Sequence, residues 1–179
     1  AGRVLSGDLQ VTAGTTARFE STVNDDVNGG TTSNLTVSAA GTTTFVGAIG
    51  ANAALSSLTT NAGGTTELCG GSVTTVNGQT YSDAVILCAN TTLTSTSAGN
   101  IVFQNTVNGD GVANRALAVN TSGLTDFQGA VGNLQALASL STNVGGTTQI
   151  GGGTVDTVGA QTYGDAVLLT NNAILTSIN

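Results

Sequence analysis

The 179-residue chain contains no proline, methionine, tryptophan, histidine or lysine, and its only cationic side chains are Arg3, Arg18 and Arg115. Ten carboxylates against these three arginines leave a net charge of −7, which argues against nucleic acid or an anionic membrane surface as a partner. The chain also has no apolar run that approaches the roughly 18 residues of a membrane span, so no membrane insertion is expected. Without histidine or lysine, the usual general acids, bases and activated nucleophiles are largely missing. These absences favour a protein that is not an enzyme and needs no cofactor.

What the chain does contain excludes disorder. Hydrophobic residues make up 39% of it and only 7% of the residues are charged, whereas disordered segments combine low hydrophobicity with high net charge. Threonine and valine are abundant, and short alternating stretches such as LTV and VTT predict β-strands. The chain begins without methionine or a signal peptide, so we expect a processed product or an excerpt of a longer protein.

A long internal repeat organises the sequence. The stretch QTYSDAV at 79–85 returns as QTYGDAV at 161–167, and residues 41–68 run in step with 123–150 at the same offset of 82. The chain therefore holds about two copies of one long unit, and such repeats are typical of stacked architectures.

A shorter pattern lies inside this repeat. Each aromatic residue is followed four residues later by Val or Ile, and is preceded by Leu or Val at a distance of eight to ten residues. Such a frame is too short to close a core alone, but stacked frames place like residues on like residues about 4.8 Å apart. The pattern predicts an interior with a Leu ladder, a Val ladder and one aromatic ladder made of Phe19, Phe45, Tyr81, Phe103, Phe127 and Tyr163.

The predicted fold class is all-β, a right-handed parallel β-solenoid of about eight coils in a single continuous domain, with an 82-residue super-repeat of four coils. Eight coils would form a rod roughly 40 Å long. The competing architecture is a tandem of immunoglobulin-like sandwiches, which the shorter period and the lack of a buried tryptophan disfavour. Cutting each frame at its Leu or Val predicts a partial coil at 1–8, full coils at 9–34, 35–57, 58–72, 73–92, 93–116, 117–139, 140–154 and 155–174, and an incomplete coil at 175–179.

The stretches GTTTFVGAIG, LTTNAGGTT, QTYSDAV and LTSTSAGNIVFQNTVNG resemble the β-strand repeats of large bacterial surface and secreted proteins. These include adhesins similar to filamentous haemagglutinin and autotransporter passengers. The resemblance covers the chain from about Leu9 to Leu175 and implies the shaft of a right-handed parallel β-helix. It implies no catalytic residues and no particular ligand.

The acidic residues are candidate sites. Asp83 and Asp165, in the two QTY motifs, follow the aromatic position where turn-forming residues are expected, so we interpret them as corner residues. Asp25, Asp26 and Asp110 lie in oxygen-rich loops that are weak candidates for calcium, although neither loop matches an EF-hand. A polysaccharide lyase built on a solenoid would need carboxylates clustered with cations, and only Arg115 near Asp110 approaches this.

Threonines raise another function. Regular threonine rows on a flat face are a means of binding ice, and Thr36, Thr59, Thr74 and Thr94 each follow a Leu or Val of the frame. The second copy breaks the row with Ala118, Ser141 and Asp156. Any strand facing solvent also favours threonine.

The two cysteines, Cys69 and Cys88, are 19 residues apart, close to one coil, and both are absent from the second copy. This favours a disulfide between neighbouring coils in an oxidising, extracellular setting. Two free buried thiols remain the alternative, because the cysteines do not occupy the same position relative to the frame.

Neither end of the chain resembles a polar cap, which a solenoid needs in order to stop its open edges from pairing. The expected partner is therefore the chain itself, end to end as a homopolymer, or neighbouring repeats of a longer chain. Together these features predict a non-enzymatic structural protein of a prokaryotic cell surface: an extracellular shaft or a self-assembling fibre subunit with a role in adhesion or matrix. An ice- or carbohydrate-binding solenoid is the alternative.

Overall fold

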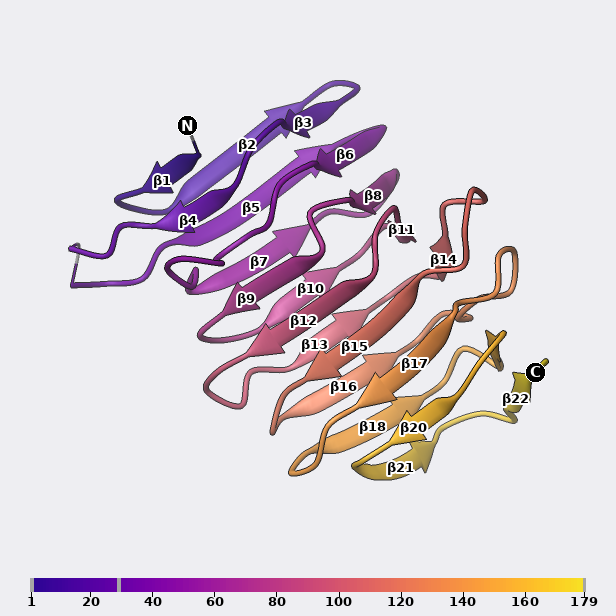
Figure 1. Cartoon of the computed structure of the whole chain (residues 1–179). Coiled ribbons are helices and arrows are strands. Elements are labelled where there is room, and N and C mark those ends of the chain that lie inside the picture. Colours follow the sequence, from indigo (N-terminus) through magenta and orange to yellow (C-terminus); the bar gives the residue numbers. More distant parts are fainter. Residues whose placement is uncertain (1, 29, 179) are drawn as a thin grey trace.

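The computed structural model describes residues 2–28 and 30–178, and every regular element in them is a β-strand (Figure 1). The strand pairs are parallel, and the chain passes along three faces in turn before it returns to the first. Successive circuits therefore stack along one axis, which confirms the predicted all-β parallel solenoid of about eight coils. The described ranges contain no helix long and apolar enough to cross a membrane.

The three faces are named here by the order in which the chain visits them. Face 1 holds β1 (Arg3–Leu5), β4 (Val23–Asp25), β9 (Ser72–Thr75), β12 (Thr91–Ser95), β15 (Ala116–Asn120), β17 (Ser139–Thr142) and β20 (Gln161–Tyr163). Face 2 holds β2 (Leu9–Ala13), β5 (Asn34–Ala39), β7 (Ser57–Thr60), β10 (Gln79–Tyr81), β13 (Ile101–Phe103), β16 (Leu124–Phe127), β18 (Thr147–Ile150) and β21 (Ala166–Leu169). Face 3 holds β3 (Ala17–Phe19), β6 (Thr42–Phe45), β8 (Thr65–Leu68), β11 (Ala84–Leu87), β14 (Val107–Gly109), β19 (Thr154–Thr157) and β22 (Ile174–Ser177).

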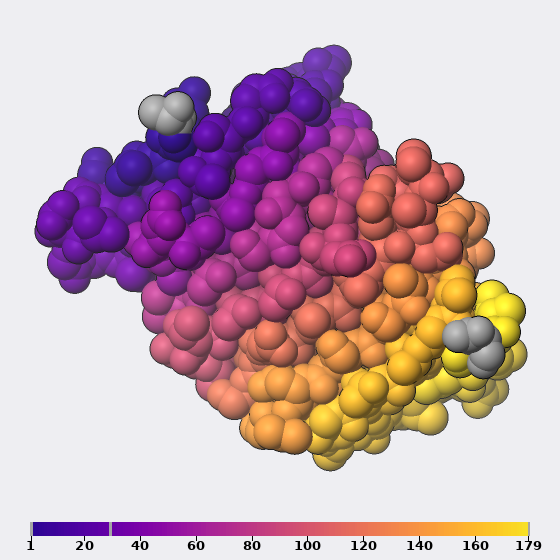
Figure 2. Space-filling view, in the orientation of Figure 1, coloured from indigo at the N-terminus to yellow at the C-terminus, as the bar shows by residue number. Residues whose placement is uncertain are grey.

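Two single residues complete the stacks where a strand is interrupted. Ile49 bridges β4 and β9 on face 1, and Val131 bridges β14 and β19 on face 3. With these two bridges, each of eight coils has one strand position on each face, and the coils are numbered along the chain from coil 1 (β1, β2 and β3) to coil 8 (β20, β21 and β22). The space-filling view shows the coils as successive colour bands from indigo to yellow, so contacts join each coil to its neighbours in the stack (Figure 2).

The register corrects part of the predicted coil division. Leu35 pairs with Leu58 and Leu117 pairs with Leu140, at the predicted spacing. Leu58, however, pairs with Gln79 and not with Val73. Residues 58–72 hold most of β7, all of β8 and only the first residue of β9, so this segment covers two faces and is about two-thirds of a coil.

The same correction applies in the second copy and at one further boundary. Leu140 pairs with Gln161, so 140–154 is also not a complete coil. Leu93 pairs with Val119, and Leu117 lies opposite Thr91. The coil that begins at Leu93 therefore ends two residues later than the predicted boundary at 116. Ala1 and Asn179, in the predicted partial coils 1–8 and 175–179, lie outside the described residues.

As a consequence, the predicted super-repeat of four coils is wrong. From β5 to β15 the chain passes eleven strand positions, which at three per coil is 3⅔ coils. Leu35 lies on face 2, whereas its counterpart Leu117 lies on face 1. The second copy is therefore displaced by one face around the axis. The faces accept the same sequence because each presents the same alternation of inward and outward side chains.

This displacement also divides the predicted aromatic ladder. Phe19 and Phe45 stack on face 3 with ring centroids 4.9 Å apart. Tyr81, Phe103 and Phe127 form a second stack on face 2, with centroids 5.3 Å and 5.0 Å apart. Tyr163 belongs to face 1, where it continues the column of Thr142.

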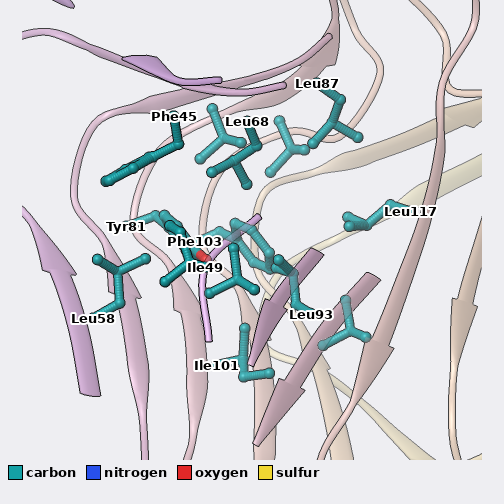
Figure 3. Packing of buried hydrophobic residues seen from close by; sticks show 14 of the residues in the cluster. Phe45, Ile49, Leu58, Leu68, Tyr81, Leu87, Leu93, Ile101, Phe103 and Leu117 are labelled. Carbon is teal, nitrogen blue, oxygen red and sulfur yellow. The ribbon is translucent and has the colours of Figure 1, made fainter. Parts of the chain in front are cut away.

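The interior is apolar and continuous. Figure 3 shows Tyr81 and Phe103 in this interior, with Phe45 and Leu68 packed near them. Leu68 takes the place above Phe45 on face 3, so an aliphatic side chain continues the aromatic column. Buried residues from Leu5 to Val155 form one cluster, and each coil relies on its neighbours to cover its inward side chains.

Glycine permits close stacking at two of the corners. At the corner between faces 3 and 1, a Cβ atom added to Gly70 would collide with the backbone of Gly47 in the coil before. At the corner between faces 2 and 3, Gly152 meets Gly129 in the same way. These corners need residues without side chains, because the main chains of successive coils lie directly against each other.

Candidate functional site

The repeated QTY motif is a structural corner. Asp83 lies between β10 and β11 and is 1% exposed. Its Oδ1 accepts a hydrogen bond from the Gly64 N–H at 2.7 Å, and its Oδ2 accepts one from the Thr66 hydroxyl at 3.2 Å. Both donors belong to the coil before, so the carboxylate joins two coils at the corner between faces 2 and 3.

Asp165 repeats this arrangement in the second copy. Its carboxylate accepts bonds from the Gly146 N–H at 2.7 Å and the Thr148 hydroxyl at 3.5 Å, at the corner between faces 1 and 2. The two aspartates thus occupy the turn-like positions that the sequence pattern indicates. Arg3 and Arg18 lie on coil 1 and Arg115 follows coil 5, so none of these cations belongs to either corner.

The sequence reasoning missed the glutamine of the motif. The Gln79 side chain is fully buried, and its Nε2 donates to the carbonyl oxygens of Val73 and Thr94 at 3.3 Å and 3.0 Å and to the Thr75 hydroxyl at 3.2 Å. Its Oε1 accepts a bond from the Tyr81 hydroxyl at 2.9 Å. Every polar group of the amide is used, which explains a buried glutamine next to a buried tyrosine.

Gln161 and Tyr163 reproduce this network in the last coil, with a hydrogen bond of 2.9 Å from the Tyr163 hydroxyl to the Gln161 amide oxygen. Burial raises the pKa of Tyr81 above its ordinary value and raises the pKa of Tyr163 to about 12. Both phenols are therefore neutral hydrogen-bond donors at physiological pH. The signal in the sequence is the spacing Q-x-Y, which recurs in both copies of the repeat.

The three candidate calcium ligands do not come together. Asp25 ends β4 and Asp26 follows it at the corner between faces 1 and 2, whereas Asp110 follows β14 at the corner between faces 3 and 1, three coils further along. Asp25 is 4% exposed and accepts bonds from the N–H and hydroxyl of Ser33 at 3.0 Å and 2.8 Å. The Oδ1 of Asp26 accepts the Asn28 N–H at 2.9 Å, beside a cavity of about 340 Å³.

Asp110 is held by its own loop. Its Oδ2 accepts a bond from the Arg115 guanidinium at 2.7 Å, and its Oδ1 accepts the N–H groups of Val112 and Ala113, each at 3.1 Å. The guanidinium and these N–H donors lower the pKa of Asp110 to about 2. The one association of a cation with a carboxylate that suggested a lyase is thus an ion pair that closes a loop.

Cys69 and Cys88 form a disulfide with a Cα–Cα distance of 4.5 Å. Each directly follows a strand of face 3, and the last residues of those strands, Leu68 and Leu87, are register partners. The cysteines are therefore neighbours in consecutive coils, although they stand at different distances from the frame. Glu67 lies close to both sulfur atoms, but sulfurs that are bonded to each other are not thiolate ligands for a metal.

The threonines do not form the single row that ice binding would use. Thr36 and Thr59 are register partners on face 2, and Thr74 and Thr94 are partners on face 1. Thr80 extends the first pair, but the column continues with Val102.

Comparisons with protein families, with curated proteins and with solved structures found no match to this chain.

Replacing Asp83 with alanine should lower the free energy of unfolding by about 1–3 kcal/mol, because the Gly64 N–H and the buried Thr66 hydroxyl lose their acceptor. Urea unfolding followed by circular dichroism measures the effect. The Asp156→Ala variant, which changes an outward carboxylate on β19, is the matched control and should stay within about 0.5 kcal/mol of the parent. Equal effects of the two substitutions would show that the corner bonds do not stabilise the fold.

Removing the disulfide with Cys69→Ala and Cys88→Ala together should lower the free energy of unfolding by about 3 kcal/mol, as expected for a cross-link that closes a loop of this length. The unmodified protein unfolded under reducing conditions should match the double variant. A parent protein whose stability does not change on reduction would contradict this expectation.

Asp110 should make the free energy of unfolding depend on pH in the acidic range. Its pKa is about 2 in the folded protein against 3.8 for the free group, so its stabilisation is complete above pH 3.8 and is lost as the pH falls toward 2. The Asp110→Asn variant should be less stable than the parent at pH 7, and the difference should shrink over that acidic range. Urea midpoints measured at several pH values test this, and parallel curves for the two proteins would contradict it.

Proposed function

We propose that this chain is a structural segment of an extracellular shaft, and that its function is to supply length and rigidity. The observation that carries the proposal is the unbroken interior, in which one buried cluster runs from coil 1 into coil 7. At about 4.8 Å per coil, eight coils span roughly 40 Å, and a longer run of the same repeat would extend the rod without a change of design.

Three further features support a role without chemistry. The polar groups of the QTY motifs are used in hydrogen bonds within the solenoid, including the carboxylates of Asp83 and Asp165. Arg115 pairs with Asp110 inside its own loop, and Arg18 pairs with Glu20 on the surface of coil 1. The chain has no histidine or lysine. We therefore assign no catalytic residue and no cofactor.

The disulfide supports an oxidising location, because disulfides are rare in the reducing cytosol. The resemblance of the repeats to filamentous haemagglutinin-like and autotransporter-like adhesins supports a prokaryotic cell surface and a role in adhesion or matrix. The partners of such a shaft are further solenoid coils, supplied by neighbouring repeats or by other copies of the chain.

An antibody raised against the purified chain should label intact cells of the source organism, because a shaft lies outside the envelope. Protease added to intact cells should remove the label and leave a cytoplasmic marker uncut, which is the control for lysis. Labelling that appears only after the cells are made permeable would contradict an extracellular shaft.

A further inference from the structure

Three side chains with metal-binding atoms meet on the outer surface of face 3. Glu67 lies in β8, Cys69 directly follows β8 in coil 3, and Cys88 directly follows β11 in coil 4. A carboxylate oxygen of Glu67 and the two sulfur atoms all lie within 4.8 Å of one another. All three residues are partly exposed, so a solute can reach them. They are named here the thiol–carboxylate group.

The backbone ladder holds the two cysteines side by side without help from their disulfide. The Cys69 N–H donates to the Phe45 carbonyl oxygen at 2.9 Å, and the Cys88 N–H donates to the Leu68 carbonyl oxygen at 3.0 Å. Leu68 and Leu87, which precede the cysteines, are register partners. Because these main-chain contacts do not involve sulfur, the two Cα atoms stay close to their separation of 4.5 Å when the S–S bond is broken.

This separation suits two sulfur ligands of one metal ion. Two sulfurs that each lie about 2.3 Å from a tetrahedral zinc ion are roughly 3.8 Å apart. Side chains that leave neighbouring coils from Cα atoms 4.5 Å apart reach that spacing by rotation about χ1. With the Glu67 carboxylate as a third ligand, two sulfurs and one oxygen favour Zn²⁺ over Ca²⁺ or Mg²⁺, which take oxygen ligands.

The third ligand is held in place from the other side. Thr44 lies in β6 of coil 2 and is the register partner of Glu67. Its hydroxyl donates to Oε2 of Glu67 at 2.8 Å. Hydrogen bonds from outer partners of this kind orient a metal ligand and limit its motion. The carboxylate is therefore fixed beside the cysteines before any metal arrives.

The second copy of the repeat lacks the whole thiol–carboxylate group. At the offset of 82, its three positions are occupied by Gln149, Gly151 and Thr170. The backbone around them is the same, because Ile150 and Leu169 pair there as their counterparts pair in the first copy. The ladder thus forms without these three side chains, so stacking alone does not explain why they occur together.

The oxidation state decides what the group can bind. In the disulfide the two sulfurs are bonded to each other and are not thiolate ligands. A dithiol reductant breaks the S–S bond by thiol–disulfide exchange: the pair gains two electrons and two protons, and the reductant becomes a disulfide. A Zn²⁺ ion that binds the two thiols displaces one proton from each.

We propose that reduction of the Cys69–Cys88 disulfide turns the thiol–carboxylate group into a zinc site, with two thiolates, the Glu67 carboxylate and one water as ligands. The ion joins coil 3 to coil 4 in place of the disulfide. Disulfide and metal exclude each other, so these two coils are cross-linked under both oxidising and reducing conditions. This goes beyond the shaft function and does not rest on it.

Cobalt(II) titration of the whole chain tests the site, because tetrahedral thiolate–cobalt centres absorb visible light. The reduced protein, freed of metal with a chelator, should bind one Co²⁺ per chain, and added Zn²⁺ should remove the absorption. The oxidised protein should show no such absorption. Reduced protein that carries Cys69→Ala and Cys88→Ala should show none either.

Substitutions of the carboxylate test the third ligand. Glu67→Gln introduces the residue of the second copy and should weaken Co²⁺ binding about tenfold or more, and Thr44→Val should weaken it about tenfold. The matched control is Glu20→Gln, which removes an exposed carboxylate of coil 1 and should bind Co²⁺ as the parent does.

Urea unfolding provides the second measurement. Zn²⁺ should raise the unfolding midpoint of the reduced, chelator-treated parent and should leave that of the oxidised parent unchanged. A reduced parent that shows no cobalt absorption, or that Zn²⁺ does not stabilise, would overturn the proposal. Equal Co²⁺ affinities of the parent and Glu67→Gln would contradict the three-ligand site. None of these results bears on the shaft function, which the antibody experiment tests separately.

Discussion

The parallel hydrogen-bond ladder between successive coils is the constraint on which the rest of this structure depends. Each strand takes its partners from the coil before and the coil after, so the register of one pair passes to the next along the whole stack. In-register stacking collects inward residues into columns and forces the corners to repeat. The stacked rings of Phe103 and Phe127 and the bare corners at Gly47 and Gly70 both follow from this one condition.

The ladder also explains why polar groups inside the solenoid are acceptable. The Asp83 carboxylate accepts the Gly64 N–H of the coil before, and the Gln79 amide donates to the Thr94 carbonyl of the coil after. Both side chains therefore add hydrogen bonds between coils to those of the backbone ladder. The same residue types, placed without such partners, would be costly to bury.

Much of the fold could be predicted from the sequence because the ladder imposes periodicity. Alternating short strands, a long repeat and the spacing from Leu to aromatic to Val predicted stacked coils. The phase of those coils could not be predicted. The three faces have equivalent inward positions, so Phe45 on face 3 and Phe127 on face 2 occupy the same place in the repeat. The 15-residue frame from Leu58 appeared in the sequence as a short coil, and only the pairing showed that it lacks one strand.

Of the candidate site, the sequence predicted the contacts that depend on local turns or on the coil spacing, but not those that depend on the neighbouring coil. The corner role of Asp83 and the proximity of Cys69 to Cys88 follow from local turn chemistry and from a spacing close to one coil. The amide network of Gln79 depends on the Thr94 carbonyl, which belongs to the next coil, and no local pattern reveals that contact. The acidic loops were grouped by composition, although the faces separate Asp25 from Asp110.

The central claim is that coils have three strands each, so that the 82-residue repeat advances by 3⅔ coils. Disulfide formation between introduced cysteines measures this most directly. The account predicts rapid intramolecular cross-linking in a variant with Thr59→Cys and Thr80→Cys, which are register partners on face 2. A variant with Thr59→Cys and Thr74→Cys should stay reduced, because Thr74 lies on face 1. Efficient cross-linking of the second pair and not of the first would show that residues 58–72 form a complete coil, and would contradict the three-faced solenoid described here.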